Sequence, residues 1–422
     1  MMGVKGAAMR KDKTILIVGT YDTKCDELQY MAECIRGQGG QVISMDVSVL
    51  GDTDGSTDFS NTDVAAAGGS SIAAARTSPD ENTAMQTMAR GAAALAKQLY
   101  GTGAFDGVIT LGGSMGTDLA LDVCQALPLG VPKYIVSTVA FSPLIPPERL
   151  AADVQMILWA GGLYGLNSIC KASLSQAAGA VLGAARAVEK PQVTPLIGMT
   201  SLGKSALSYM VPLKPELEAR GFEVAVFHAT GMGGRAFESL AAQGAFACVF
   251  DFCTQELGNH EHGSSLSAGA DRLTGAARAG TPQLVAPGCY DLVDLVGWQP
   301  LPDIWRDRTV HAHNRLLTSV VLNAEERRQV ARAHLRQLSG VASPTTFILP
   351  RGGCGAWDRP GADLHDPNGL AAFCDTLRDE WQGPARLIEL DAHINDAAFA
   401  DEALAVFDGW LADGTVVRDL IG

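Results

Sequence analysis

The stretch of this chain that most restricts its fold runs from Asp106 to Thr117 and reads DGVITLGGSMGT. Its first part, Val108 to Leu111, is a short apolar, β-branched run of the kind found in strands that are covered on both faces. A glycine-rich turn follows, and the residues after Thr117 fit the first turns of a helix. A strand, a glycine-rich turn and a helix in this order direct several backbone N–H groups at one point, where a phosphate or a carboxylate binds well. The stretch therefore predicts an anion-binding turn within an α/β domain.

The same alternation of apolar strands and helical periodicities continues along the chain. It predicts an α/β fold with mostly parallel sheets flanked by helices. A length of 422 residues is too great for one ordinary core, and the pattern breaks at Glu189-Lys190-Pro191. We therefore expect two Rossmann-like domains, residues 1–190 and 191–422. The polar segment from Gly51 to Pro79 is expected to be a long surface loop.

Composition excludes several classes of function. The formal net charge is -14, which argues against nucleic acid as a partner because a phosphate backbone needs a basic surface. The nine cysteines form no CxxC pair, which is typical of reduced thiols in a cytoplasmic protein. Residues 1–13 lack the apolar core of a signal peptide, and no apolar stretch is long enough to span a bilayer. The chain is expected to be cytoplasmic, with no membrane partner.

The first predicted strand, residues 14–18, ends in a second polar corner, GTYDTK, at Gly19 to Lys24. Here Lys24 could contact a phosphate oxygen, and Asp22 or Thr23 could cap the helix that follows. The alternative is that Asp22 is only a cap and Lys24 only a solvated side chain. No GxxxxGK[ST] pattern is present, and the turn lacks GxGxxG, so a dinucleotide site is disfavoured. The corner can bind a phosphate tightly only if it faces the turn around Ser114.

The second half of the chain holds all eight histidines and a further glycine-rich turn, Ala229 to Arg235. His228 with the carboxylate of Glu256 could act in general acid/base chemistry, and Arg235 could hold an anion. The alternative is that a histidine at a strand end is simply hydrogen-bonded in place. No metal site formed by protein ligands is expected, because nothing near the two histidines of HAHN adds the required spacing. The other residues considered at predicted strand ends or loops are Asp291, His311, His313 and His393.

Eight motifs, in this order and spacing, resemble the bacterial and plant family of ATP-binding proteins named for the tomato mosaic virus resistance protein. They are GTYDTK, LGGSMGT, PKYIVSTVA, FHATGMGGRAFE, GCYDLVDL, HAHN, LPRGGCG and HINDAAFA. The resemblance covers nearly the whole chain from Thr14. It implies two Rossmann-like domains, a homodimer, and ATP with magnesium bound to the first domain. In plants the family's unit is fused to a barrel domain and hinders viral replication by binding a viral protein.

Carried over to this chain, the family's nucleotide corner falls on residues of the two turns of the first domain. They are Gly19, Thr20, Asp22, Thr23, Lys24, Gly112, Gly113, Ser114, Gly116 and Thr117. This chain departs from the family pattern at Met115, where a glycine is usual, and at Met232 and Cys289-Tyr290 in the second domain. Met115 would narrow the phosphate site, and the other changes would alter a substrate pocket.

Three functions are compatible with this reading of the sequence. In the first, the protein binds ATP and its second domain binds or transforms a small anionic metabolite, with His228 and Glu256 as acid/base groups and Arg235 as the anion clamp. In the second, it is a nucleotide-sensing interaction module without catalysis. In the third, it is a lyase or hydrolase of sugar acids or phosphates that does not use ATP.

Overall fold

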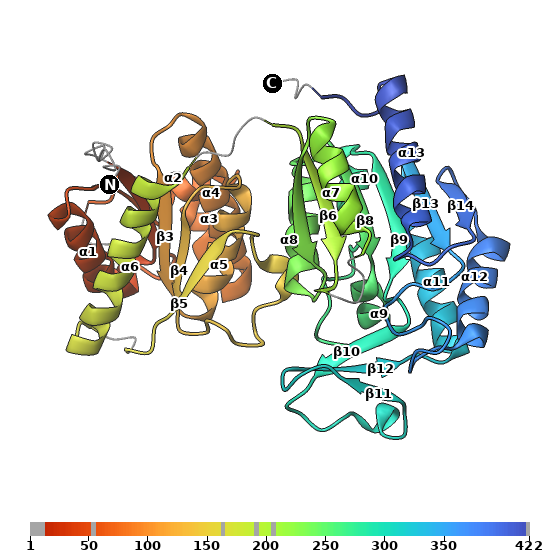
Figure 1. The fold of residues 1–422 in the computed structure, drawn as a ribbon. Helices are drawn as coiled ribbons and strands as arrows, with labels where there is room; N and C mark the ends of the chain where they lie inside the picture. Colours follow the sequence, from red (N-terminus) through yellow and green to blue (C-terminus); the bar gives the residue numbers. More distant parts are fainter. Residues whose placement is uncertain (1–12, 52–55, 162–164, 190–193, 204–207, 419–422) are drawn as a thin grey trace, which may run out of the picture. The chain divides into compact units, whose positions relative to one another are not determined.

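The computed structural model describes residues 13–51, 56–161, 165–189, 194–203 and 208–418. The chain divides into two compact units, Met1–Pro191 and Gln192–Gly422. Each unit contains a parallel sheet with helices packed on both faces, and Figure 1 shows the sheets and their helices. The predicted fold class, α/β with two Rossmann-like domains and mostly parallel sheets, is confirmed.

The first unit is built on a five-stranded sheet of order β2-β1-β3-β4-β5, in which every neighbouring pair is parallel. The strand order reverses between β1 and β3, and such a reversal is where open parallel sheets bind ligands, outside the carboxyl ends of the strands. The strands are β1 Thr14–Gly19, β2 Gln41–Asp46, β3 Gly107–Gly112, β4 Lys133–Ser137 and β5 Val154–Leu158. The helices are α1 Tyr21–Gly37, α2 Asn61–Ala67, α3 Ile72–Arg76, α4 Glu81–Gly101, α5 Ser114–Ala126, η1 Pro147–Arg149 and α6 Ser168–Ala187.

Two apolar layers hold the first unit together. On one face of the sheet, α1 and α6 pack over Ile15, Ile17 and Ile109. On the other face, α2 to α5 pack over Leu16 and Val108. Alternate residues of β1 and β3 thus enter opposite layers, which explains why both strands are apolar throughout.

The segment from Gly51 to Pro79 is not the long loop that its polar composition suggests. It contains α2 and α3, each begun by a serine cap: Ser60 forms a capping box with Asp63, and Ser71 accepts a hydrogen bond from the N–H of Ala74. Serine favours turns and helix starts alike, so composition alone did not separate the two. Both helices then pack against α4.

The second unit has a six-stranded parallel sheet of order β14-β13-β9-β8-β6-β7, with its reversal between β6 and β8. Helices α7 and α13 cover one face, and α9, α11 and α12 cover much of the other. The strands are β6 Leu196–Ser201, β7 Glu223–His228, β8 Cys248–Cys253, β9 Gln283–Gly288, β13 Thr345–Pro350 and β14 Arg386–Leu390. The helices are α7 Met210–Ala219, α8 Met232–Ala242, α9 Gln255–Glu261, α10 Gly275–Ala279, η3 Asp303–Trp305, α11 Ala324–Leu338, α12 Pro367–Glu380 and α13 Ala397–Asp413.

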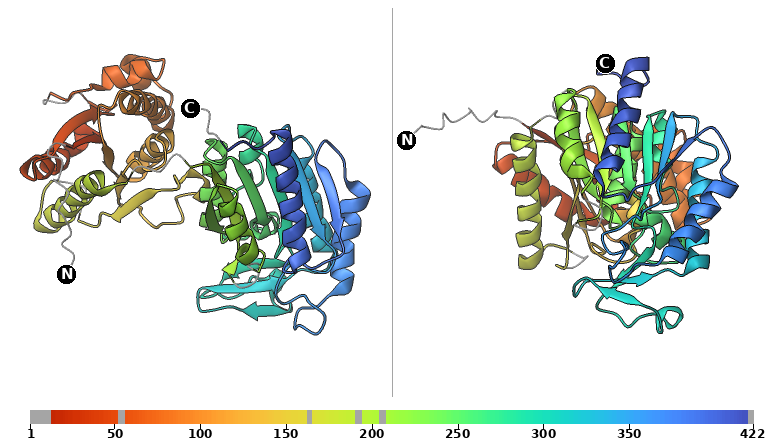
Figure 2. Two further views of the ribbon diagram at one scale, coloured as in Figure 1. Left: turned by 45° about the horizontal axis from the view of Figure 1, so that its top comes forward. Right: turned by 45° about the vertical axis from the view of Figure 1, so that its right-hand side comes forward.

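A separate antiparallel sheet of order β10-β12-β11 was not anticipated from the sequence. Its strands are β10 Leu292–Val296, β11 Val310–Ala312 and β12 Leu317–Val321. Figures 1 and 2 show this sheet beside α9, beyond the carboxyl ends of the parallel strands. We call it the arm. Its segments are short and their apolar residues do not alternate over a long run, so no strong strand signal marks them.

The turn between β3 and α5 depends on close backbone contact at Gly112. A Cβ atom at this position would lie 2.6 Å from the Cα atom of Gly116, which real Cβ atoms do not tolerate. Because the obstacle is backbone, it cannot move aside as a side chain would.

We predict that Gly112→Ala lowers the free energy of unfolding by about 1–3 kcal/mol, the usual cost of inserting a methyl group into packed structure. Gly37→Ala is the matched control, because a Cβ there meets no atom within 4 Å; a helical glycine-to-alanine change is neutral or stabilising. Urea denaturation of both variants checks this, and equal stability of the two would contradict it.

Candidate functional site

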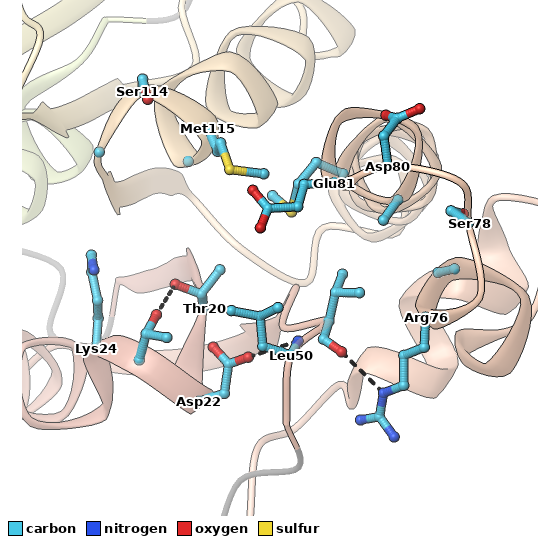
Figure 3. A pocket seen from close by; sticks show the side chains of 17 residues that line it. Thr20, Asp22, Lys24, Leu50, Arg76, Ser78, Asp80, Glu81, Ser114 and Met115 are labelled. Atoms are coloured by element: carbon cyan, nitrogen blue, oxygen red, sulfur yellow. Dashed lines mark hydrogen bonds between the residues drawn. The ribbon is translucent and has the colours of Figure 1, made fainter.

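A cavity of about 480 Å³ opens at the carboxyl ends of β1 and β3, at the reversal of strand order in the first unit. Figure 3 shows Thr20, Asp22 and Lys24 along one wall and Ser114 and Met115 along the opposite wall. The two turns that the sequence places far apart, after β1 and after β3, therefore face each other. Seven of the ten predicted nucleotide residues line this space: Thr20, Asp22, Thr23, Lys24, Gly113, Ser114 and Gly116.

The start of α5 contributes one wall of the cavity, through residues 113–116. The first amides of a helix have no carbonyl partner inside the helix, and α5 is preceded by Gly113, which has no side chain to cap them. The first intrahelical hydrogen bond comes from the N–H of Thr117 to the carbonyl of Gly113, at 2.8 Å. The amides of Ser114 to Gly116 thus begin the helix at the cavity wall, where the helix dipole favours an anion.

The opposite wall is the first turn of α1, which is offset from the rest of the helix. Lys24 has a non-helical backbone (φ -136°, ψ 29°), so the helix is kinked at the residue that follows Thr23. The hydroxyl groups of Thr20 and Thr23 are hydrogen-bonded to each other at 2.9 Å. The turn therefore offers two hydroxyl groups and one ammonium group to the same cavity.

Asp22 does not cap α1, because Thr20 occupies the N-cap position and Asp22 lies in the first turn. One carboxylate oxygen of Asp22 accepts hydrogen bonds from the N–H groups of Leu50 and Gly51, both at 3.1 Å. The other oxygen, Oδ1, is buried and has no hydrogen-bond partner among the described residues. A buried, unsatisfied carboxylate oxygen in a cavity wall is costly unless a ligand, a cation or water completes it.

The remaining part of the cavity combines apolar and polar residues and was not predicted. Its lining includes Val49, Leu50, Ala75, Ala84 and Met85 together with Arg76, Ser78, Asp80 and Glu81. These residues come from the segment after β2, from α3, from α4 and from the residues between these two helices, so no local sequence pattern connects them with the two turns. Apolar contact area and several polar groups within one cavity of this size are typical of small-molecule sites.

The other three predicted nucleotide residues shape the turns and do not line the cavity. Gly19 leaves room for Leu28, whose Cδ2 atom would lie 2.6 Å from an added Cβ. Gly112 makes the close backbone contact described above. Thr117 is buried, and its hydroxyl group is hydrogen-bonded to the carbonyl of Gly113 at 2.7 Å and to the hydroxyl group of Ser137 at 2.6 Å.

In the second unit, Glu256 occupies the place that an anion was expected to take. Its carboxylate accepts hydrogen bonds from the N–H groups of Gly231, at 2.5 Å, and Gly234, at 3.1 Å, at the start of α8. The same carboxylate is paired with buried Arg272, whose Nε lies 3.0 Å away. Burial raises the pKa of Glu256 to about 7 against the opposing effect of Arg272. The second glycine-rich turn is thus filled by the protein's own carboxylate.

The structure does not bring the three predicted catalytic residues together as a free site. Arg235 is buried and forms an ion pair with Asp271 at 2.6 Å, so it is not available as an anion clamp in this arrangement. His228 is exposed at the end of β7, and its Nδ1 lies 3.4 Å from the carbonyl oxygen of Ser201. An acid/base role for His228 with Glu256 stays a prediction that this geometry does not favour.

The other candidates of the second unit lie in two places. His393 is buried, with Nε2 2.8 Å from the carboxylate of Asp358, and it accepts a hydrogen bond from the N–H of Asn395, which fits a structural role. Asp291 is also buried, and its Oδ1 has no hydrogen-bond partner among the described residues. His311 belongs to the arm, where its ring lies against Trp357 at 4.2 Å, and His313 follows it by two residues.

Comparison with known proteins accounts for both units. The N-terminal domain of the uncharacterised protein family UPF0261 matches residues 13–190, and the C-terminal domain of the same family matches residues 194–411. The chain belongs to the UPF0261 family. A UPF0261 protein of Brucella suis is 56% identical over 405 residues, which cover 96% of this chain and 97% of that protein. A UPF0261 protein of Clostridium tetani is 34% identical over 392 residues, 92% of this chain and 96% of the relative.

A plant relative supports the family resemblance that was inferred from the eight motifs. The tomato protein named ToMV resistance protein Tm-1(GCR237) is 28% identical over 427 residues, which cover 95% of this UPF0261 chain but 56% of the tomato protein. Among solved structures, the Streptomyces glycosyltransferase SsfS6 covers 65% of this chain and 82% of its own, at a TM-score of 0.22 and 16% identity, too distant a likeness to inform function. Within the described residues, no helix has the length and apolarity needed to cross a membrane.

The buried carboxyl group of Asp291 generates a pH-dependent prediction. Burial raises the pKa of Asp291 to about 6, opposed by Arg327 and reinforced by Asp358. A carboxyl group with a raised pKa binds its proton more tightly in the folded state, so its contribution to stability is full below about pH 4 and is lost as the pH rises through 6. We predict that Asp291→Asn removes this loss, so that the variant gains up to about 3 kcal/mol relative to the wild type between pH 4 and pH 7.

Urea denaturation at several pH values measures the difference, and Asp363→Asn, at an exposed position, serves as the matched control. A stability difference between Asp291→Asn and the wild type that does not change with pH would contradict the prediction.

Proposed function

We propose that the first unit of this UPF0261 protein binds a nucleotide, ATP together with magnesium. The observation that carries the proposal is that the turn after β1 and the uncapped start of α5 face each other across one cavity. Backbone N–H groups, hydroxyl groups and one lysine are the donors that phosphate groups bind in proteins. The resemblance to the family named for the tomato mosaic virus resistance protein supports ATP as the nucleotide.

The number of hydrogen-bond donors in the cavity is sufficient for micromolar affinity. Each hydrogen bond to a charged phosphate oxygen contributes about 1.5–3 kcal/mol, and three or four of them reach the micromolar range. The phosphate groups would lie between Thr20 and the amides of Ser114 to Gly116. The base and the ribose would then extend toward the part of the cavity where Val49, Ala75 and Met85 provide apolar contact area.

Asp22 fits the requirement of magnesium. Mg²⁺ in nucleotide sites is held by one or two carboxylates together with phosphate oxygens and water. The buried Oδ1 of Asp22 lacks a partner among the described residues, and its Oδ2 is fixed by two backbone N–H groups. When bound, the ion would neutralise phosphate charge beside this carboxylate.

Whether the nucleotide is hydrolysed separates two forms of the proposal. The residues described as lining the cavity include the carboxylates of Asp22, Asp80 and Glu81 but no histidine. This arrangement supports binding directly and turnover only through one of these carboxylates, so a nucleotide-sensing module without catalysis is the second candidate. Release of inorganic phosphate from ATP by the purified protein distinguishes them.

We also propose that the protein is a homodimer, on the basis of the family resemblance, and that it is cytoplasmic, on the basis of its composition.

We predict that Lys24→Ala weakens ATP binding roughly tenfold to hundredfold, because it removes one charge-assisted contact worth about 1.5–3 kcal/mol. Lys97→Ala is the matched control, since Lys97 is exposed on α4 and does not belong to the cavity lining. Isothermal titration calorimetry with ATP and Mg²⁺ gives both dissociation constants. Unchanged affinity in Lys24→Ala would remove this lysine from the site.

We predict that Gly113→Val preserves the fold but weakens ATP binding at least tenfold. A Cβ at Gly113 meets nothing nearer than the Thr138 hydroxyl oxygen, at 3.8 Å, and the backbone of Gly113 (φ -76°) suits any residue. The added methyl groups would stand at the cavity wall beside the amides of α5. Thermal denaturation verifies the fold and calorimetry the affinity; tight ATP binding by this variant would place the phosphates elsewhere.

A further inference from the structure

A carboxylate from α4 enters the cavity of the first unit from the side opposite Asp22. Glu81 is the first residue of α4, and both Glu81 and Asp22 line the cavity. Figure 3 shows the Glu81 carboxylate extending from α4 into the cavity, toward the side on which Thr20 and Asp22 lie. The two acidic side chains come from the starts of α1 and α4, which are far apart in the sequence, so the tertiary structure brings them to one space.

The carboxylate of Glu81 is not used by the protein's own structure. It is exposed and has no hydrogen-bond or ion-pair partner among the described residues. The neighbouring Asp80 differs, because it caps α4: its two carboxylate oxygens accept hydrogen bonds from the N–H of Thr83 at 2.7 Å and from the hydroxyl group of Thr83 at 3.0 Å. Figure 3 shows the carboxylate of Asp80 turned away from Thr20 and Asp22. Glu81 is therefore the acidic group of α4 that can contact a ligand in this cavity.

The charge of the cavity lining opposes the entry of a free nucleotide. The described lining holds more acidic than basic side chains: Asp22, Asp80 and Glu81 against Lys24 and Arg76. The guanidinium group of Arg76 is engaged with the protein, since its Nε donates a hydrogen bond to the carbonyl of Val49 at 3.0 Å. Charges of one sign within a cavity are screened less than charges on an open surface, so anionic phosphate groups are repelled by Glu81 and Asp22. A triphosphate therefore needs a cation to offset these two carboxylates.

We propose that Glu81 makes nucleotide binding depend on a divalent cation. Together with Asp22, whose Oδ1 has no hydrogen-bond partner among the described residues, it holds the cation that accompanies the phosphate groups. Carboxylate oxygens bind Mg²⁺ directly or through its water ligands. Without the cation, the same carboxylate repels the nucleotide. This inference rests on the proposed function and adds to it the residue that selects the metal complex of a nucleotide over the free nucleotide.

Isothermal titration calorimetry of the full chain with ATP, once in Mg²⁺ and once in EDTA, tests this inference. We expect the wild type to bind ATP about tenfold or more tightly in Mg²⁺ than in EDTA. In Glu81→Gln, the affinity should fall severalfold in Mg²⁺ and rise in EDTA, so that most of the dependence on Mg²⁺ disappears. Glu33→Gln is the matched control, because it neutralises an exposed carboxylate of α1 outside the described cavity lining, and it should keep both wild-type affinities.

The ligand-free Tm of Glu81→Gln separates this role from a structural one. Because Asp80 still caps α4, the Tm should stay close to that of the wild type. If the wild type binds ATP neither in Mg²⁺ nor in EDTA, the nucleotide proposal fails and this inference fails with it. If the wild type binds ATP in Mg²⁺ but the affinity of Glu81→Gln in EDTA does not rise, this inference alone is overturned, and Glu81 serves only the dipole of α4.

Discussion

The approach of the start of α5 to the end of β3 is the contact on which the candidate site depends. Gly112 and Gly116 lie so close that no side chain fits between them, and this closeness turns the chain directly from strand into helix. The consequence is electrostatic as well as steric. The uncapped amides of α5 begin at the carboxyl edge of the sheet, beside the reversal of strand order, where the turn after β1 supplies hydroxyl groups and a lysine.

The two glycine-rich turns of the chain show that such a turn does not by itself make a ligand site. Both follow a strand and begin a helix, and the sequence offers no reason to treat them differently. In the first unit the residues of the turn and of the helix start line a cavity. In the second unit, Glu256 reaches the amides of Gly231 and Gly234 from another strand end and is itself neutralised by Arg272. An internal carboxylate there performs the structural task that a bound phosphate would perform in the first unit.

The role of the arm follows from the same strand ends. Parallel sheets leave their carboxyl edge open, and in the second unit the arm lies beyond that edge, beside α9. Asp294 and Ser319 are buried there as a hydrogen-bonded pair. Polar groups are costly to bury without partners. The buried polar residues at this edge therefore distinguish it from the two faces of the sheet, which pack against their helices through apolar layers.

The sequence by itself determined the α/β class and most strands, because apolar β-branched runs such as Val108 to Leu111 and their glycine-rich ends are local signals. It also singled out Thr20, Lys24 and Ser114. Only the tertiary structure decided that Val49, Ala75 and Met85 complete their cavity, that Asp22 holds the loop at Leu50, and that Arg235 is neutralised by Asp271. These contacts join residues that are distant along the chain. A local sequence pattern does not show which distant side chain will pair with a given donor.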